Sequence, residues 1–132
     1  MAGINGGGMN FAKKVVTVLK NITDANIVLC KVEMDKKNPL ESGVNTSIPE
    51  EDYKNKSVIL VDDVLNSGTT LIYGVHHFLK TPIKQLKTAV LVNRNHKKFP
   101  VKADFKGISL STSLNEHIEV EFQPKNDAVY LE

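Results

Sequence analysis

The chain has 132 residues, of which 41% are hydrophobic and 24% are charged, and its formal net charge is +2. This length suits one domain with an ordinary core, so we expect a single domain over residues 1–132. A net charge so close to zero does not by itself favour a nucleic-acid partner. No apolar run approaches the roughly 20 residues of a membrane span, so no membrane partner is expected. The single cysteine, Cys30, excludes an internal disulfide and favours a cytoplasmic location.

The first third of the chain predicts a strand, a helix and a second strand. Residues 2–4 have the pattern of a strand's last residues, so the N-terminus looks truncated. The glycine run after them permits the close backbone approach that anion-binding loops need. Apolar residues then recur at helical spacing, at Phe11, Val15, Val18 and Leu19. Residues 27–32 are a β-branched run typical of a strand, and residues 35–51 lack periodicity, which predicts a long loop.

Residues 58–70 are the most informative stretch of the sequence. Four apolar residues predict a strand buried on both faces, and two adjacent carboxylates, Asp62 and Asp63, follow at its end. A turn rich in Ser, Gly and Thr then leads into a helix over residues 71–79. Backbone N–H groups of such a turn, together with the helix dipole, favour a phosphate. The carboxylates repel phosphate but accept hydrogen bonds from ribose hydroxyls, so the predicted ligand is a phosphorylated ribose.

The second half of the chain continues the alternation of strands and helices. Residues 86–92 predict another buried strand, and a polar segment beginning at Asn93 and Arg94 follows its carboxyl end. Strand-like runs at residues 118–122 and 128–131 close the chain. This order predicts an α/β domain whose central, mainly parallel sheet is flanked by helices. Ligands of such sheets bind beyond the carboxyl ends of the strands, where the predicted polar segments would meet.

Residues 58–70 resemble the signature of the type I phosphoribosyltransferases, in which paired acids contact the ribose of phosphoribosyl pyrophosphate (PRPP) and the next loop holds its 5′-phosphate. The resemblance implies the type I phosphoribosyltransferase fold, with a small hood contributed by about residues 99–132. It implies a catalytic role for Asp62 and Asp63. The residues it assigns to PRPP are these two acids and Val64, Leu65, Asn66, Ser67, Gly68, Thr69 and Thr70. A generic buried strand before a polar turn is the alternative interpretation.

The same resemblance places pyrophosphate binding in the glycine run, at Asn5, Gly6 and Gly7. This run departs from relatives that carry Thr-Arg-Gly there, and a flexible tag remnant is the alternative. Lys36 and Lys37 could also meet the pyrophosphate, although solvated surface lysines are the preferred interpretation. Mg²⁺ is expected to bind mainly through PRPP, with no direct protein ligands assigned.

Residues 86–112 narrow the resemblance to the pyrimidine-operon attenuator/uracil phosphoribosyltransferase family, and the similarity extends over essentially the whole chain. That family has an extra N-terminal helix and most of a first strand, which this chain lacks. Residues implied in base binding are Asn93, Arg94, Phe105, Lys106 and Thr112. Phe105 would stack on the base, with a role as a core aromatic as the equally weighted alternative. The resemblance also implies a homodimer or a higher homo-oligomer.

The implied activity is transfer of phosphoribosyl from PRPP to a nucleobase, with release of pyrophosphate. Asn66 stands where purine-using relatives carry an Asp that takes a proton from the base, and an amide cannot do this. Asn93 stands where those relatives carry a Lys, so uracil is the predicted base. The alternative is an RNA-binding regulator of pyrimidine genes that senses a nucleoside monophosphate in the same pocket. RNA binding is expected to be weak, because Arg94 is the only arginine among 17 basic residues.

Overall fold

The computed structural model describes all residues, 1–132. Its helices are α1 (Gly7–Lys20), α2 (Pro39–Ser42) and α3 (Thr69–Leu79), with a 3-10 turn, η1, at Glu50–Asp52. Its strands are β1 (Ala2–Ile4), β2 (Cys30–Glu33), β3 (Asn45–Thr46), β4 (Ser57–Leu65), β5 (Gln85–Asn93), β6 (Phe105–Ser109), β7 (Ile118–Glu121) and β8 (Ala128–Leu131). None of the helices is long and apolar enough to cross a membrane.

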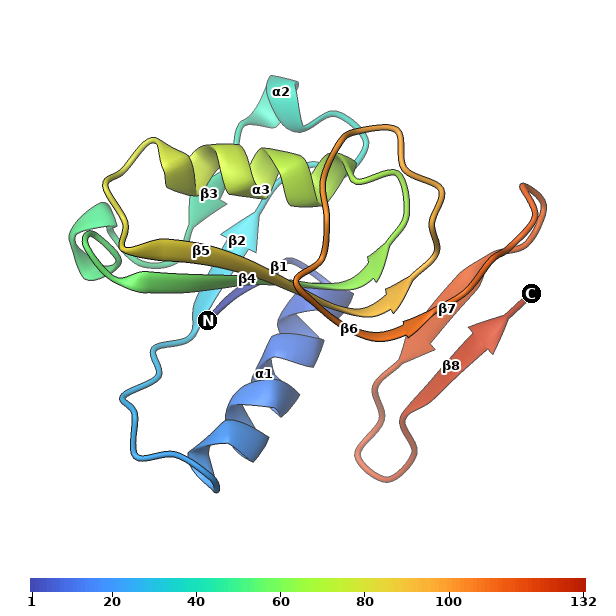
Figure 1. Cartoon of the computed structure of the whole chain (residues 1–132), viewed down its shortest axis with the longest axis horizontal. Coiled ribbons are helices and arrows are strands. Elements are labelled where there is room, and N and C mark those ends of the chain that lie inside the picture. The colour runs from blue at the N-terminus through green and yellow to red at the C-terminus, as the bar shows by residue number, and fades with distance from the viewer.

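Six strands form one sheet in the order β3-β2-β1-β4-β5-β6, and every neighbouring pair is parallel except β2 and β3. Helix α1 covers one face of this sheet, and α2 and α3 cover the other (Figure 1). The predicted α/β architecture with a mainly parallel sheet is therefore confirmed. The predicted loop over residues 35–51 is wrong in part, because α2, β3 and η1 occupy it. These elements are too short to produce a periodic sequence signal.

Strand β4 runs through the centre of the sheet and is longer than the sequence predicted. Its apolar part supplies Leu60 and Val61, which are fully buried. The strand then continues past the predicted end at residue 61, because Val64 and Leu65 still pair with β5. The acid pair therefore belongs to the strand itself. Its side chains are held by the sheet's pleat rather than by a mobile loop.

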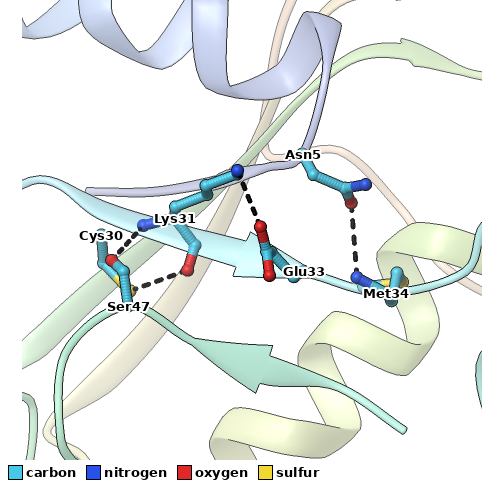
Figure 2. A network of polar contacts seen from close by, with 6 residues as sticks. All are labelled: Asn5, Cys30, Lys31, Glu33, Met34 and Ser47. Carbon is cyan, nitrogen blue, oxygen red and sulfur yellow. Dashed lines mark hydrogen bonds and ion pairs between the residues drawn. The ribbon is translucent and has the colours of Figure 1, made fainter. Parts of the chain in front are cut away.

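Strand β2 is hydrogen-bonded along both edges close to the glycine run (Figure 2). On one edge the Asn5 N–H donates to the Val32 carbonyl at 2.8 Å, and the Met34 N–H donates to Asn5 Oδ1 at 3.4 Å. On the other edge the Lys31 N–H donates to Ser47 Oγ at 2.8 Å, and the Ser47 N–H donates to the Lys31 carbonyl at 2.9 Å. These bonds fix where β1 ends and where the turn into α1 begins.

The hairpin of β7 and β8 forms a separate two-stranded antiparallel sheet beside the main one (Figure 1). Strand β6 belongs to the main sheet, since it pairs in parallel with β5 from Phe105 to Ser109. The part of the chain outside the main sheet therefore begins after Ser109. The hood expected from about residue 99 stays a prediction. Part of the range assigned to it, strand β6, belongs to the main sheet.

Candidate functional site

A cavity of about 330 Å³ lies at the carboxyl ends of β4 and β5. Its wall contains every residue from Asp62 to Leu71, together with Lys36, Val90, Arg94, His117 and Ile118. The structure thus brings all nine residues assigned to PRPP, 62–70, to one hollow. This is the edge at which parallel α/β sheets hold their ligands.

The acid pair forms the floor of this cavity. The side chain of Asp62 is almost fully buried, with 3% of its surface exposed. Its Oδ1 accepts the Asp63 N–H and its Oδ2 accepts the Thr70 hydroxyl, each at 2.9 Å. Burial, and then the neighbouring charge of Asp63, raise the pKa of Asp62 to about 7, while Lys36 and Thr70 act in the opposite direction. Asp62 therefore keeps its proton to a higher pH than an ordinary aspartate, because burial and the adjacent charge disfavour its ionised form.

The glycine run packs directly against the acid pair. A Cβ on Gly7 would collide with the Asp63 carboxylate, and a Cβ on Gly8 would lie 2.9 Å from Asp62 Oδ1. Gly6 has a φ of 83°, in the left-handed region that favours glycine. The run is thus a packed turn that starts α1, which does not fit the alternative of a flexible tag remnant.

Of the residues assigned to pyrophosphate, Gly7 lies beside Asp63, Gly6 faces Lys36, and the Asn5 side chain accepts a hydrogen bond from Met34 (Figure 2). None of the three belongs to the cavity wall. Lys36 approaches from the segment after β2. Its Nζ lies 3.6 Å from where a Cβ on Gly6 would stand, and the side chain lines the cavity near Asp62. Lys36 is exposed, as the preferred interpretation of a solvated lysine expects, but it also borders the cavity.

The loop that precedes α3 has the features of a phosphate site. Gly68 has a φ of 86°, and the first bond of the helix runs from the Ile72 N–H to the Gly68 carbonyl at 2.9 Å. The Thr69 N–H donates to Ser67 Oγ at 3.3 Å, and the N–H groups of residues 70 and 71 form the open end of the helix. The hydroxyls of Ser67 and Thr69 lie 2.8 Å apart at the same end. Such a helix start favours a bound anion.

A distant segment fixes the shape of this loop. The Ser67 carbonyl accepts the N–H groups of Lys98 and Phe99 at 2.7 and 3.1 Å. A Cβ on Gly68 would lie 2.6 Å from Val101 Cγ1, so only glycine fits beneath that side chain. The loop before α3 is therefore held in place by the segment that follows β5, which sequence reasoning had treated only as a polar stretch.

Two of the residues assigned to base binding do not reach the cavity. The strand register pairs Phe105 with Ala89 in the middle of β5, away from its carboxyl end. Phe105 is 57% exposed and lines two cavities near Met1 and Ile59, and Lys106 lines one of them. Phe105 is therefore not placed to stack on a base in the cavity, which corrects the prediction. Its exposure does not fit the alternative role as a core aromatic either. The reason is that β6 joins the main sheet, a long-range pairing that the local pattern does not encode.

Of the other three assigned residues, one lines the cavity and two lie outside its wall. Asn93 is buried, and its Oδ1 accepts the Asn95 N–H at 3.1 Å, so it shapes a turn outside the cavity wall. Thr112 also lies outside the wall, where its hydroxyl accepts the Arg94 Nε–H at 2.7 Å. Only Arg94 contributes to the wall itself. It is 7% exposed and engaged with neighbouring protein groups.

Sequence reasoning missed His117 and Ile118, which also line the cavity. They stand at the start of β7, far along the chain from residues 62–70. The His117 N–H donates to the Glu132 carbonyl at 2.7 Å, and the Glu132 N–H donates back at 2.8 Å. No motif marks this position, and only the placement of the hairpin beside β4 reveals it.

The model of the phosphoribosyl transferase domain matches residues 1–127. The chain therefore belongs to the phosphoribosyltransferase domain family. Within it, the chain is 32% identical to the bifunctional protein PyrR of Pediococcus pentosaceus over 129 residues, covering 91% of this chain and 73% of that protein. It is 33% identical to the bifunctional protein PyrR of Streptococcus pneumoniae over 132 residues, covering 96% of this chain and 75% of that protein. The predicted resemblance is confirmed.

Solved structures show the same fold at lower identity. The hypoxanthine phosphoribosyltransferase of Trypanosoma cruzi superposes with a TM-score of 0.74 at 17% identity over 89% of this chain, which spans 62% of the length of that protein. The purine phosphoribosyltransferase of Pyrococcus horikoshii gives a TM-score of 0.64 at 24% identity over 83% of this chain and 68% of that one. These likenesses confirm the predicted type I fold.

Asp62 should make the stability of the unliganded protein depend on pH. Its folded-state pKa of about 7 lies above the ordinary value of 3.8, so the folded state holds the proton more tightly. The free energy of unfolding should therefore be highest below about pH 4, fall as the pH rises to 7, and then level off, by on the order of a few kcal/mol. Asp62→Asn should remove most of this fall. Urea unfolding between pH 4 and 8 measures it.

Asp24→Asn, at an exposed acid, is the control for this experiment and should leave the pH dependence of the wild-type protein unchanged. A fall of the same size in the Asp62→Asn protein would show that other groups cause it.

Proposed function

We propose that this chain transfers phosphoribosyl from PRPP to a nucleobase, preferably uracil, and releases pyrophosphate. The observation that carries the proposal is the convergence of the acid pair and the open end of α3 in one cavity. One end of such a ligand must donate hydrogen bonds to carboxylates, and the other must be an anion. A ribose 5-phosphate moiety meets both requirements.

The loop and the acid pair would have separate roles in the reaction. The loop over residues 67–70 would hold the 5′-phosphate, and the ribose hydroxyls would donate to Asp62 and Asp63. A base nitrogen then attacks the anomeric carbon as the bond from that carbon to pyrophosphate breaks. The negative acid pair favours the positive charge that develops on the ribose, which is electrostatic stabilisation by fixed groups. Holding both reactants in line supplies the rest of the rate enhancement.

Mg²⁺ fits this arrangement as an ion held mainly by the substrate. It prefers oxygen ligands and is commonly bound by one or two carboxylates together with substrate phosphates. Asp62 and Asp63 supply such carboxylates, and no group of three or more His, Cys, Asp or Glu side chains offers a fuller cage. When bound with PRPP, the ion would neutralise charge on the departing pyrophosphate.

The preference for uracil is supported by Asn66. Its side chain lines the cavity, and its Oδ1 accepts an Arg94 N–H at 3.2 Å. An amide fixed in this way has no titratable group with which to take a proton from a purine. Asn93 gives less support, because its side chain is occupied by the turn at Asn95. The base would lie toward His117 and Ile118, the remaining wall of the cavity.

A panel of bases tests the activity and the preference together. With Mg²⁺ and PRPP, pyrophosphate release should be faster with uracil than with hypoxanthine or guanine. Asp62→Asn combined with Asp63→Asn should abolish release and weaken PRPP binding while the fold is retained. Faster turnover with a purine would overturn the assignment of uracil. Unchanged PRPP affinity in the folded double variant would overturn the role of the acid pair.

Lys36 should contribute to PRPP affinity, whereas its neighbour Lys37 should not. The cavity wall includes Lys36 but not Lys37, and both side chains are exposed. A lysine beside the turn at Gly6 is placed to meet the pyrophosphate, in a loop that lacks an arginine. Lys36→Ala should raise the Kd for PRPP by roughly tenfold, the loss of about 1.4 kcal/mol, and should leave ribose 5-phosphate binding nearly unchanged. Isothermal titration of both ligands measures this.

Lys37→Ala is the matched control, since it removes the same charge one residue away. Equal effects of the two substitutions on PRPP affinity would mean that Lys36 acts only through the overall charge.

RNA binding is the second candidate function, favoured by the similarity to relatives that are named bifunctional. With a net charge of +2 and one arginine, any binding should be weak and should fall steeply with salt, because it would depend on phosphate contacts. Gel-shift titrations at low and physiological salt measure this. Sequence-selective binding tighter than roughly micromolar at physiological salt would lie beyond the usual non-specific range and would favour the regulatory function.

A further inference from the structure

The side chain of Arg94 joins two parts of the site that are otherwise separate. It leaves the end of β5 and is buried, with 7% of its surface exposed. Its Nη1 donates to Asn66 Oδ1 at 3.2 Å, in the phosphate loop. Its Nε donates to the Thr112 hydroxyl at 2.7 Å, and its Nη2 donates to the Ser113 carbonyl at 3.0 Å and to the Glu116 carbonyl. The guanidinium thus bridges the phosphate loop and residues 112–116, which we call the wall segment.

No other side chain makes hydrogen bonds to both the phosphate loop and the wall segment. The remaining hydrogen bonds from the end of β5 to this region come from Asn93, whose carbonyl accepts the Leu110 N–H at 2.9 Å, and from His96, whose Nε2 lies 2.5 Å from the Thr112 carbonyl. Neither residue makes a hydrogen bond to Asn66. The planar fork of an arginine can hold several acceptors in fixed directions, which a lysine cannot do.

The wall segment leads directly into the residues that face the base. Its turn is closed by the Ser113 N–H, which donates to a Glu116 carboxylate oxygen, and by the Glu116 N–H, which donates to the Ser113 carbonyl at 3.3 Å. His117 and Ile118, which line the cavity, follow at once. By holding the Glu116 carbonyl, Arg94 fixes the backbone immediately before them.

We propose that Arg94 is a positioning residue that couples the phosphate loop to the base-side wall of the cavity. This inference rests on the proposed function, since the loop must first hold a ribose phosphate. A phosphate bound at residues 67–70 immobilises the loop, and Asn66 with it. The amide oxygen of Asn66 then holds the guanidinium, whose other donors hold the wall segment. Filling one half of the site thereby stabilises the other half before the base arrives.

Hydrogen exchange followed by mass spectrometry tests this with ribose 5-phosphate, a ligand that has no base. In the wild-type protein the ligand should slow exchange several-fold in peptides that cover residues 67–70 and in peptides that cover residues 112–118. Thr112→Val removes the acceptor of the Nε bond and lies outside the cavity wall. In this variant the ligand should still protect residues 67–70 but should protect residues 112–118 less than in the wild-type protein, because only the Nη2 bonds to the Ser113 and Glu116 carbonyls remain.

Two further variants complete the test. Arg94→Lys keeps the charge but loses the fork, and it should behave as Thr112→Val does, with circular dichroism confirming its fold. Ser111→Ala, at an exposed neighbour that makes no side-chain hydrogen bond, should retain the wild-type response. A purely static brace would loosen residues 112–118 equally with and without ligand, so the response to ligand separates the two roles.

Three results would overturn the inference. The first is protection of residues 67–70 in the wild-type protein without protection of residues 112–118. The second is a wild-type response in both Thr112→Val and Arg94→Lys. The third is no protection of residues 67–70 in the wild-type protein, which would overturn the proposed function as well and is thereby distinguished from the first two.

Discussion

The burial of Asp62 beside Asp63 is the electrostatic constraint on which the rest of the site depends. A buried carboxylate is costly to ionise unless donors or a cation offset the loss of water. Asp62 has only one backbone N–H and the Thr70 hydroxyl as donors. Burial, and then the charge of Asp63, therefore still raise its pKa to about 7. The unliganded site is therefore short of hydrogen-bond donors and positive charge. A ligand that brings hydroxyl groups or a divalent cation would supply these donors or this charge.

The surrounding backbone is shaped by the need to approach these acids closely. The first turn of α1 lies against them, so Gly7 and Gly8 leave no room for side chains. On the other side, Gly68 adopts a positive φ beneath Val101, which lets α3 begin next to the acid pair. Parallel strands bring all of these ends to one edge, because each strand is followed by a crossover that starts from the same side.

The two halves of the cavity differ in how they are built. The half proposed to hold the ribose phosphate comes from β4 and the loop directly after it, so short stretches of chain carry it. The half proposed to hold the base comes from the end of β5 and the start of β7, joined through Arg94. Its form depends on contacts between distant segments. The two halves meet where Arg94, from the second half, donates a hydrogen bond to Asn66, in the first.

The sequence by itself determined the alternation of strands and helices, the parallel sheet, and the acid pair with its phosphate loop. These features are encoded locally, in apolar runs, glycine positions and adjacent residues such as Asp62 and Asp63. Only the tertiary structure decided which residues complete the cavity. The pairing of β6 with β5 moves Phe105 away from the site, and the placement of β7 brings His117 to it. Strand pairing and hairpin placement are set by long-range packing, which a local residue pattern does not specify.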